Sequence, residues 1–267
     1  MKFLGKSACT KFFVAALAIM SLSCVALAQT PPAPATPATP VAAPATATTT
    51  PTMDQILSRY VESIGGRAAW QKLTSRQSIG TIDIPAMNLS GTLQVHEKAP
   101  SDMLSVVVIA GAAFRRGFDG KTGWSDDPQN GVRELSGPEL AEARQQAGFY
   151  HSIELAQTYS KLSVVGTEKI GDQDAYVVDA TPVEGAVVKL YFDMQTGLMV
   201  RIKGQRHTPQ GAMDFQEDLS DYRDADGIKL PFTIRQAAGG AEFTIRITEV
   251  HHNVALDDSQ FAKPAAQ

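Results

Sequence analysis

Cysteine is nearly absent from this chain of 267 residues, which has two, and both lie close to the N-terminus. Cys9 and Cys24 fall in a segment that we expect to be removed on export. The remaining protein would then have no thiol. A disulfide, a thiolate nucleophile and a cysteine metal site are therefore all excluded.

Clusters of basic residues are also lacking. The formal net charge is −4, and residues 1–28 contribute three lysines and no acid, so removing them leaves −7. An acidic chain without a Lys/Arg cluster binds the nucleic-acid backbone poorly. We therefore expect no nucleic-acid partner.

The motifs of common catalytic and metal sites are missing as well. The histidines are scattered, without an HExxH pair or a triad spacing, and the chain has no GxSxG turn. The acidic pairs Asp126-Asp127, Asp257-Asp258 and Glu217-Asp218 lack the spacing of a calcium loop and are typical of turns or exposed strand ends. We predict that the protein is not an enzyme, has no catalytic residues, and holds no metal and no cofactor.

The first 28 residues have the pattern of an export signal. Lys2, Lys6 and Lys11 precede an apolar run over residues 12–28 that ends in Ala-Leu-Ala, a typical cleavage site for signal peptidase. The run is shorter than the roughly 20 residues of a membrane-spanning helix, so we expect no integral span after cleavage. Cys24 leaves a lipoprotein signal open as an alternative, although Ser21 stands where that motif has Leu.

Residues 29–52 consist almost wholly of Pro, Ala and Thr. Such a segment cannot bury enough apolar surface to offset the entropy of ordering it. We predict a disordered linker over 29–52, followed by one domain over 53–267.

The domain begins with a predicted helix and then changes to strand periodicity. Thr52 and Gln55 form a capping-box pair, apolar residues recur at helical spacing to Ile64, and Gly65-Gly66 ends the helix. After Arg76 the apolar residues alternate instead. Strands are expected at Ile82–Ile84, Leu89–Val95, Val106–Val108, Tyr176–Ala180, Val188–Phe192, Leu198–Ile202, Met213–Phe215, Ile228–Ile234 and Phe243–Ile247.

Turns between these strands predict hairpin neighbours, hence an α+β fold that is mainly antiparallel β. A turn pattern F-D-x-x-T-G occurs twice, at Phe118–Gly123 and Phe192–Gly197, and we interpret it as one hairpin turn used twice. A second helix is predicted over Glu139–Gly148, because Ser136-Gly137-Pro138 is a start signal. This helix divides the strands into two runs.

Four stretches resemble exported proteins of the LolA/LolB-like outer-membrane lipoprotein-sorting family. They are YVESIGGRAAWQKL at 60–73, FDGKTGW at 118–124, YFDMQTGLMVR at 191–201 and YRDADGIKLPFTI at 222–234. The resemblance implies a curved, unclosed β-barrel of about eleven strands, with helices covering a concave face that accepts acyl chains. It also implies a soluble periplasmic protein, whereas lipidation at Cys24 would make it an outer-membrane lipoprotein.

A ligand cavity on the concave face would be lined by apolar side chains of the strands. The candidates are Leu89, Leu93, Val106, Val108, Phe118, Leu190, Phe192, Val200, Phe232, Ile234, Phe243 and Ile245. The lid candidates are Leu57, Tyr60 and Leu140, together with Arg115 and Arg116, because carriers of this family use an arginine that hydrogen-bonds the lid.

Two functions remain open at this point. The first is an exported protein that binds or carries a hydrophobic ligand, such as a lipid or the acyl chains of a lipoprotein. The alternative is an envelope module that binds or senses a protein partner, with the concave face filled by its own side chains and no lipid cargo.

Overall fold

The computed structural model describes residues 50–183, 185–208 and 211–265, with the side chains of 207 and 208 left out. The predicted signal peptide 1–28, Cys9, Cys24, and the linker up to residue 49 lie outside the described residues. Residues Pro51–Gln267 form one unit.

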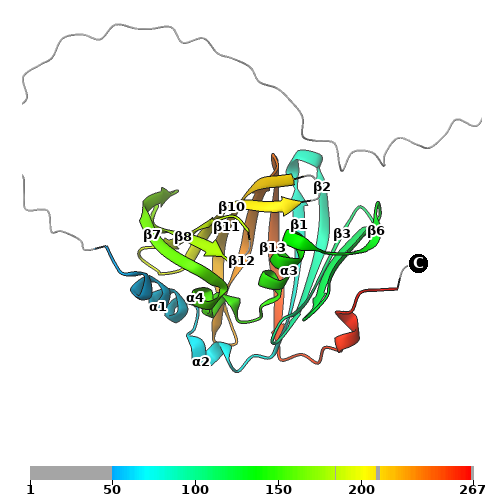
Figure 1. Ribbon diagram of the computed structural model, residues 1–267, viewed down its shortest axis with the longest axis horizontal. Helices are drawn as coiled ribbons and strands as arrows, with labels where there is room; N and C mark the ends of the chain where they lie inside the picture. The colour runs from blue at the N-terminus through cyan, green and yellow to red at the C-terminus, as the bar shows by residue number, and fades with distance from the viewer. Residues whose placement is uncertain (1–49, 184, 209–210, 266–267) are drawn as a thin grey trace, which may run out of the picture. The chain divides into compact units, whose positions relative to one another are not determined.

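A single antiparallel sheet makes up most of this unit (Figure 1). The first run of strands is β1 (Ser75–Ile84), β2 (Leu89–Lys98), β3 (Asp102–Ile109), β4 (Ala112–Asp119), β5 (Gly123–Asp127) and β6 (Gly131–Glu134). The second run is β7 (Tyr159–Ile170), β8 (Gln173–Pro182), β9 (Val188–Asp193), β10 (Met199–Thr208), β11 (Gly211–Ala225), β12 (Ile228–Ala238) and β13 (Ala241–His252).

The strand order is β6-β5-β4-β3-β2-β1-β13-β12-β11-β10-β9-β8-β7, so β6 and β7 are the two edges of a sheet that does not close. The first and last strands pair at its centre, where Ile82 lies opposite Ile245. The predicted α+β, mainly antiparallel fold with a curved, unclosed sheet is confirmed, and the described chain has thirteen strands where about eleven were expected.

The helices are short and lie before, between and after the strands. They are α1 (Met53–Ser63), α2 (Arg67–Trp70), η1 (Pro85–Met87), α3 (Gly137–Ala147), η2 (His151–Ile153), α4 (Leu155–Thr158) and η3 (Asp258–Gln260). The capping box is present: Gln55 donates its N–H to the Thr52 hydroxyl, and Thr52 donates its N–H to the Gln55 side chain. Among the described residues, no helix combines the length and apolar character needed to cross a bilayer.

One face of the sheet carries the helices, and we call it the inner face. Side chains alternate along a strand, and directly paired residues lie on the same face. Pairing therefore places Arg76, Glu97, Met103 and Phe118, from four successive strands, together on this face. Every second residue along β1–β4 can be assigned to the inner face by counting from these four.

The largest core cluster lies where α1, α2, η2 and α4 pack against β8, β9, β10 and β12. Its buried members are Ile56, Tyr60, Ile64, Trp70, Leu73, Phe149, Ile153, Leu155, Val178, Ala180, Leu190, Phe192, Met199 and Ile228. The Tyr60 ring packs edge-on against Phe192 at 5.3 Å between centroids. This half of the inner face is closed by side chains of the protein itself.

A buried ion pair links the neighbouring strands β1 and β2 on the inner face. Arg76 donates two hydrogen bonds to Glu97, at 2.7 and 2.8 Å, and both side chains are 10% exposed. The guanidinium lies 5.8 Å from the centroids of Trp70 and Phe149. Burial alone would raise the pKa of Glu97, but the adjacent Arg76 charge and its hydrogen bonds hold that pKa below its usual value of 4.5.

We expect Glu97→Gln to lower the free energy of unfolding by about 3–5 kcal/mol, because it leaves the Arg76 charge buried without compensation. The control is Lys169→Ala, which removes a pair with Asp174 whose side chains are 62% and 65% exposed. The control should cost less than about 1 kcal/mol. Chemical denaturation measures both, and equal costs would contradict the structural importance of the buried pair.

The same pair predicts a pH dependence. A carboxylate whose folded-state pKa is depressed stabilises the fold above its unfolded-state pKa, and this contribution disappears as the pH falls through the folded-state value. Wild-type stability should therefore fall below about pH 4.5 more steeply than that of Glu97→Gln. Denaturation midpoints across this acid range provide the measurement; parallel curves would show that Glu97 contributes nothing to acid sensitivity.

Candidate ligand-binding hollow

One apolar cluster of the inner face lies outside the part that helices cover. We call it the inner patch: Ile82, Ile84, Leu89, Val107, Ile109, Phe243 and Ile245, from β1, β2, β3 and β13. Among the described residues, none from an α-helix belongs to this cluster. Ile82, Ile84 and Ile109 are buried, and the other four are half-buried. The patch is thus an apolar wall that is only partly covered.

Helix α3 lies within the curve of the sheet (Figure 1), where it packs against β4, β5 and β10. It starts at Gly137-Pro138, and its contact side is made of small residues, with Ala143 and Ala147 almost completely buried. These alanines pack with Met103, Phe118 and Leu135, and Leu140 lies against the same cluster. A Cβ on Gly123 would come within 2.9 Å of the Leu140 Cδ1 atom, so glycine allows the close approach of β5.

Three arginines of the sheet hold α3 by polar contacts. Arg133 of β6 makes two hydrogen bonds to the Glu139 carboxylate, at 2.8 and 2.9 Å. Arg116 of β4 donates to the Glu139 carbonyl oxygen at 3.3 Å. On the other flank, the Nε of Arg206 lies 3.6 Å from the Glu142 carboxylate. The helix is therefore attached by few apolar side chains and by charge on both sides.

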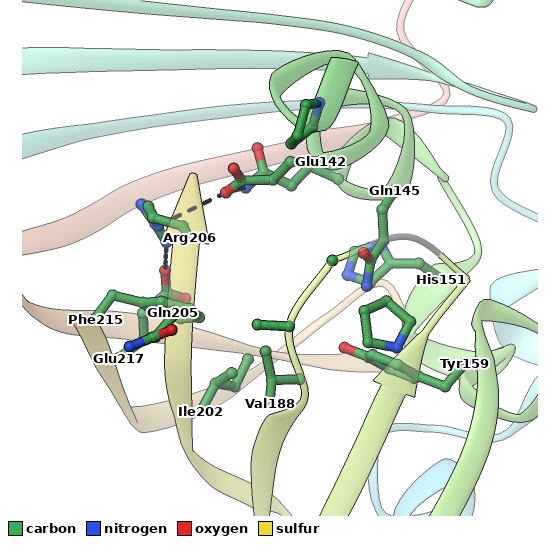
Figure 2. A pocket seen from close by; sticks show the side chains of 15 residues that line it. Glu142, Gln145, His151, Tyr159, Val188, Ile202, Gln205, Arg206, Phe215 and Glu217 are labelled. Carbon is green, nitrogen blue, oxygen red and sulfur yellow. Dashed lines mark hydrogen bonds and ion pairs between the residues drawn. The ribbon is translucent and has the colours of Figure 1, made fainter. Parts of the chain in front are cut away.

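A cavity of about 230 Å³ lies between α3 and strands β7, β9, β10 and β11. Figure 2 shows Glu142 and Gln145 reaching in from α3, and Arg206 placed between Glu142 and Glu217. Arg206 donates to Glu217 at 2.9 Å and stacks over the Phe215 ring at 4.4 Å. The apolar floor includes Val188 and Ile202.

The polar groups of this cavity are partly desolvated. Burial raises the pKa of Glu217, against the opposing effect of Arg206. Burial lowers the pKa of His151 and raises that of Tyr159. A second cavity, of about 370 Å³, lies on the other side of the α3 C-terminus and is bordered by Arg144, Tyr150 and the exposed Val183.

The described residues contain no group of three or more His, Cys, Asp or Glu side chains that could hold a metal ion. Arg206 lies against two carboxylates, Glu142 and Glu217, and the remaining cavity walls are largely apolar. The chemistry that this arrangement offers is charge recognition beside an apolar surface.

The predicted cavity residues divide into four groups, and three of these groups lie on the inner face. Leu89, Phe243 and Ile245 belong to the inner patch. Leu93 is buried on the inner face beside Val107, while Ile234 is half-buried opposite Ile245 and Phe232 is 8% exposed. Phe118, Leu190 and Phe192 are 1% exposed and form core beneath the helices.

Val106, Val108 and Val200 lie on the opposite face, away from the helices. Val106 and Val108 pair with Gln94 and Thr92, whereas Val107, one position away, belongs to the inner patch. Val200 packs with Val177 and Tyr191 in a separate cluster. Continuous apolar runs do not show which alternate residue faces inward, and a register shift between Met199 and Arg201 changes the phase again.

The lid candidates also separate. Tyr60 and Leu57 of α1 belong to the main core or pack against it, and burial raises the pKa of the Tyr60 phenol to about 12. Leu140 of α3 packs against the cluster that contains Phe118 of β4. Arg116 of β4 hydrogen-bonds the Glu139 carbonyl of α3. Arg115 points to the opposite face, where it pairs with Asp126 at 2.9 Å. Helix α3 therefore packs through fewer large apolar side chains than α1.

Sequence reasoning missed Arg206 and Glu142, and its placement of Glu217 at a turn or an exposed strand end is wrong, because Glu217 lies within β11 and lines the cavity. The signal was present in β11, where Glu217 interrupts an inward row that contains Phe215 and Leu219. A charged residue at an inward position is rarely buried without a partner. Its partner, Arg206, follows Ile202 and Gly204 in the inward row of β10.

Comparison with known proteins identifies the fold. No protein-family model and no curated protein matches the chain. Among solved structures, a DUF1329 family protein from Desulfovibrio piger is similar, with a TM-score of 0.52 and 15% identity, over 78% of this chain and 96% of that one. A LolA superfamily protein from Nitrosomonas europaea has a TM-score of 0.50 and 16% identity, over 80% and 99%. The chain therefore has a LolA-like fold, as its sequence resemblance implied.

We expect α3 to open locally more often than α1, because less apolar surface holds it. Glu139→Gln should increase amide hydrogen exchange in α3 about ten-fold, since it weakens two charge-assisted hydrogen bonds with Arg133. Exchange mass spectrometry of α1 and α3 peptides measures both effects.

The matched control is Asp126→Asn, which weakens the pair with Arg115 on the opposite face. It should leave α3 exchange unchanged. If α3 exchanges as slowly as α1 in the wild type and in Glu139→Gln, then α3 is a fixed part of the core.

Proposed function

We propose that this chain is an exported, periplasmic protein that binds a hydrophobic ligand, such as the acyl chain of a lipid or lipoprotein, on its inner face. The observation that carries the proposal is the inner patch, an apolar wall that the α-helices leave only partly covered. The export signal over 1–28 and the linker over 29–52 supply the route and the tether. A lipid anchor at Cys24 is the alternative location.

The energetics of such binding need no chemical step. Each methylene removed from water contributes about 0.8 kcal/mol, so a chain of moderate length supplies several kcal/mol. Half-buried Leu89, Val107 and Ile245 would complete their burial against it. A protein that only carries its ligand therefore needs an apolar surface and a way to uncover it.

The size of the cavity beside Arg206 supports a movement of α3 on ligand binding. At about 230 Å³ it is smaller than the roughly 300–1,000 Å³ of typical ligand pockets. Outward displacement of α3 would join this cavity to the inner patch, because Glu217 of the cavity pairs with Gln236, and Gln236 pairs with Phe243 of the patch. The few apolar contacts of α3 make this displacement inexpensive.

A second candidate is an envelope module that binds a protein partner without lipid cargo. The small cavity beside Arg206 and the self-filled core under α1 favour it. Purification of the exported form followed by native mass spectrometry separates the two. Co-purified lipid supports the carrier, whereas an empty protein that ignores fluorescent fatty-acid probes contradicts it.

We expect the double variant Val107→Ser, Ile245→Ser to bind a fluorescent fatty-acid probe about ten-fold more weakly than the wild type, because two apolar contacts of the patch are lost. The control is Val106→Ser, Val108→Ser, which makes the same kind of change on the opposite face. Probe titration measures both affinities. Equal weakening in the two variants would place the binding site elsewhere.

A further inference from the structure

Two arginines that contact α3, Arg116 and Arg206, each have a buried Nε without a hydrogen-bond partner among the described residues. The single side-chain hydrogen bond that Arg116 makes among the described residues is the one to the Glu139 carbonyl oxygen, at 3.3 Å. Within the described residues, its Nε is buried and has no hydrogen-bond partner. The hydroxyl of Ser125 is also buried without a hydrogen-bond partner among the described residues. Ser125 lies directly opposite Arg116 in the β4–β5 pair.

Arg206 faces the same space from the other wall. Its Nε is also buried without a hydrogen bond and lies 3.6 Å from the Glu142 carboxylate. Strands β4 and β10 are far apart in the sheet order, yet both arginines contact α3 within one turn, Arg116 at the Glu139 carbonyl and Arg206 at the Glu142 carboxylate. Burial lowers the pKa of Arg116, and the charges of Glu142 and Glu139 oppose this shift. Helix α3 therefore presents polar acceptors to arginines from both walls.

Displacement of α3 would remove the Glu142 carboxylate along with Glu139. Arg116 would then have no acidic neighbour from α3, and Arg206 would keep Glu217 alone. An unpaired guanidinium beside apolar surface is costly, and an incoming anion relieves that cost by charge-assisted hydrogen bonds. The vacated place adjoins the inner patch, since Arg116 pairs with Ser105, two residues before Val107.

We propose that the ligand is an anionic amphiphile, whose headgroup takes the place of the Glu142 carboxylate between Arg116 and Arg206 while its apolar chain covers the inner patch. Glu142 is then an internal substitute for the headgroup, and α3 and the ligand compete for the same arginines. This inference rests on the proposed function. A fatty carboxylate and an anionic phospholipid share the required chemistry.

The wild-type protein tests the headgroup directly through competition with a fluorescent fatty-acid probe. Hexadecanoate should displace the probe about ten-fold more effectively than hexadecanol, and hexadecylamine should be weakest. In the phospholipid arm, phosphatidylglycerol is compared with phosphatidylcholine in the same micelles. Preference for the anion in either arm supports the inference and identifies the source.

Equal binding of charged and neutral ligands in both arms overturns it while leaving the carrier function intact. Absence of binding by every ligand overturns the proposed function, and the inference with it.

Matched variants locate the effect. Arg116→Met should abolish the preference for hexadecanoate over hexadecanol, whereas Arg115→Met, the same charge change on the opposite face, should preserve it. Glu142→Gln should strengthen hexadecanoate binding several-fold, because it weakens the internal competitor. Thermal unfolding of each variant verifies that it folds. If Arg115→Met and Arg116→Met have equal effects, net charge and not the site determines the preference.

Discussion

An unclosed, curved sheet with one apolar face must cover that face, and the rest of this structure follows from how unevenly it does so. Beneath α1, α2, η2 and α4, large side chains such as Trp70 and Phe192 fill the space completely. Beneath α3 the cover consists of two alanines and one leucine. The residues of the inner patch pack on one another, and among the described residues no α-helix residue belongs to that cluster. The burial of the inner face thus decreases from a fixed core to a partly covered wall.

Charged residues hold α3, which lies between the core under α1 and the partly covered inner patch. Arg116, Arg133 and Arg206 fasten α3 by contacts that depend on charge, and such contacts are exchangeable in a way that packed aromatic rings are not. The buried Arg76–Glu97 pair belongs to the fixed part, because aromatic rings enclose it. The same residue types therefore serve a permanent and a releasable contact in one face of the sheet.

The sequence predicted elements whose local chemistry is strong. The turn F-D-x-x-T-G acts twice as expected: the Asp119 and Asp193 side chains each accept the backbone N–H of the threonine three residues later, at 2.6 Å. The capping box at Thr52 and the start of α3 also follow from local signals. β7 was not predicted, because its largely exposed residues do not alternate in a way that reveals an inner face. The phase of β3 and the meeting of Arg206 with Glu142 depend on long-range register, which no local pattern contains.

The central claim is that an apolar chain lies against the inner patch. A fatty acid with a photoreactive diazirine near its methyl end tests this most directly, by crosslinking to the wild-type protein and peptide mapping. The account predicts adducts at Val107, Phe243 and Ile245. Adducts at Val106 and Val108, or spread evenly over both faces, would contradict it.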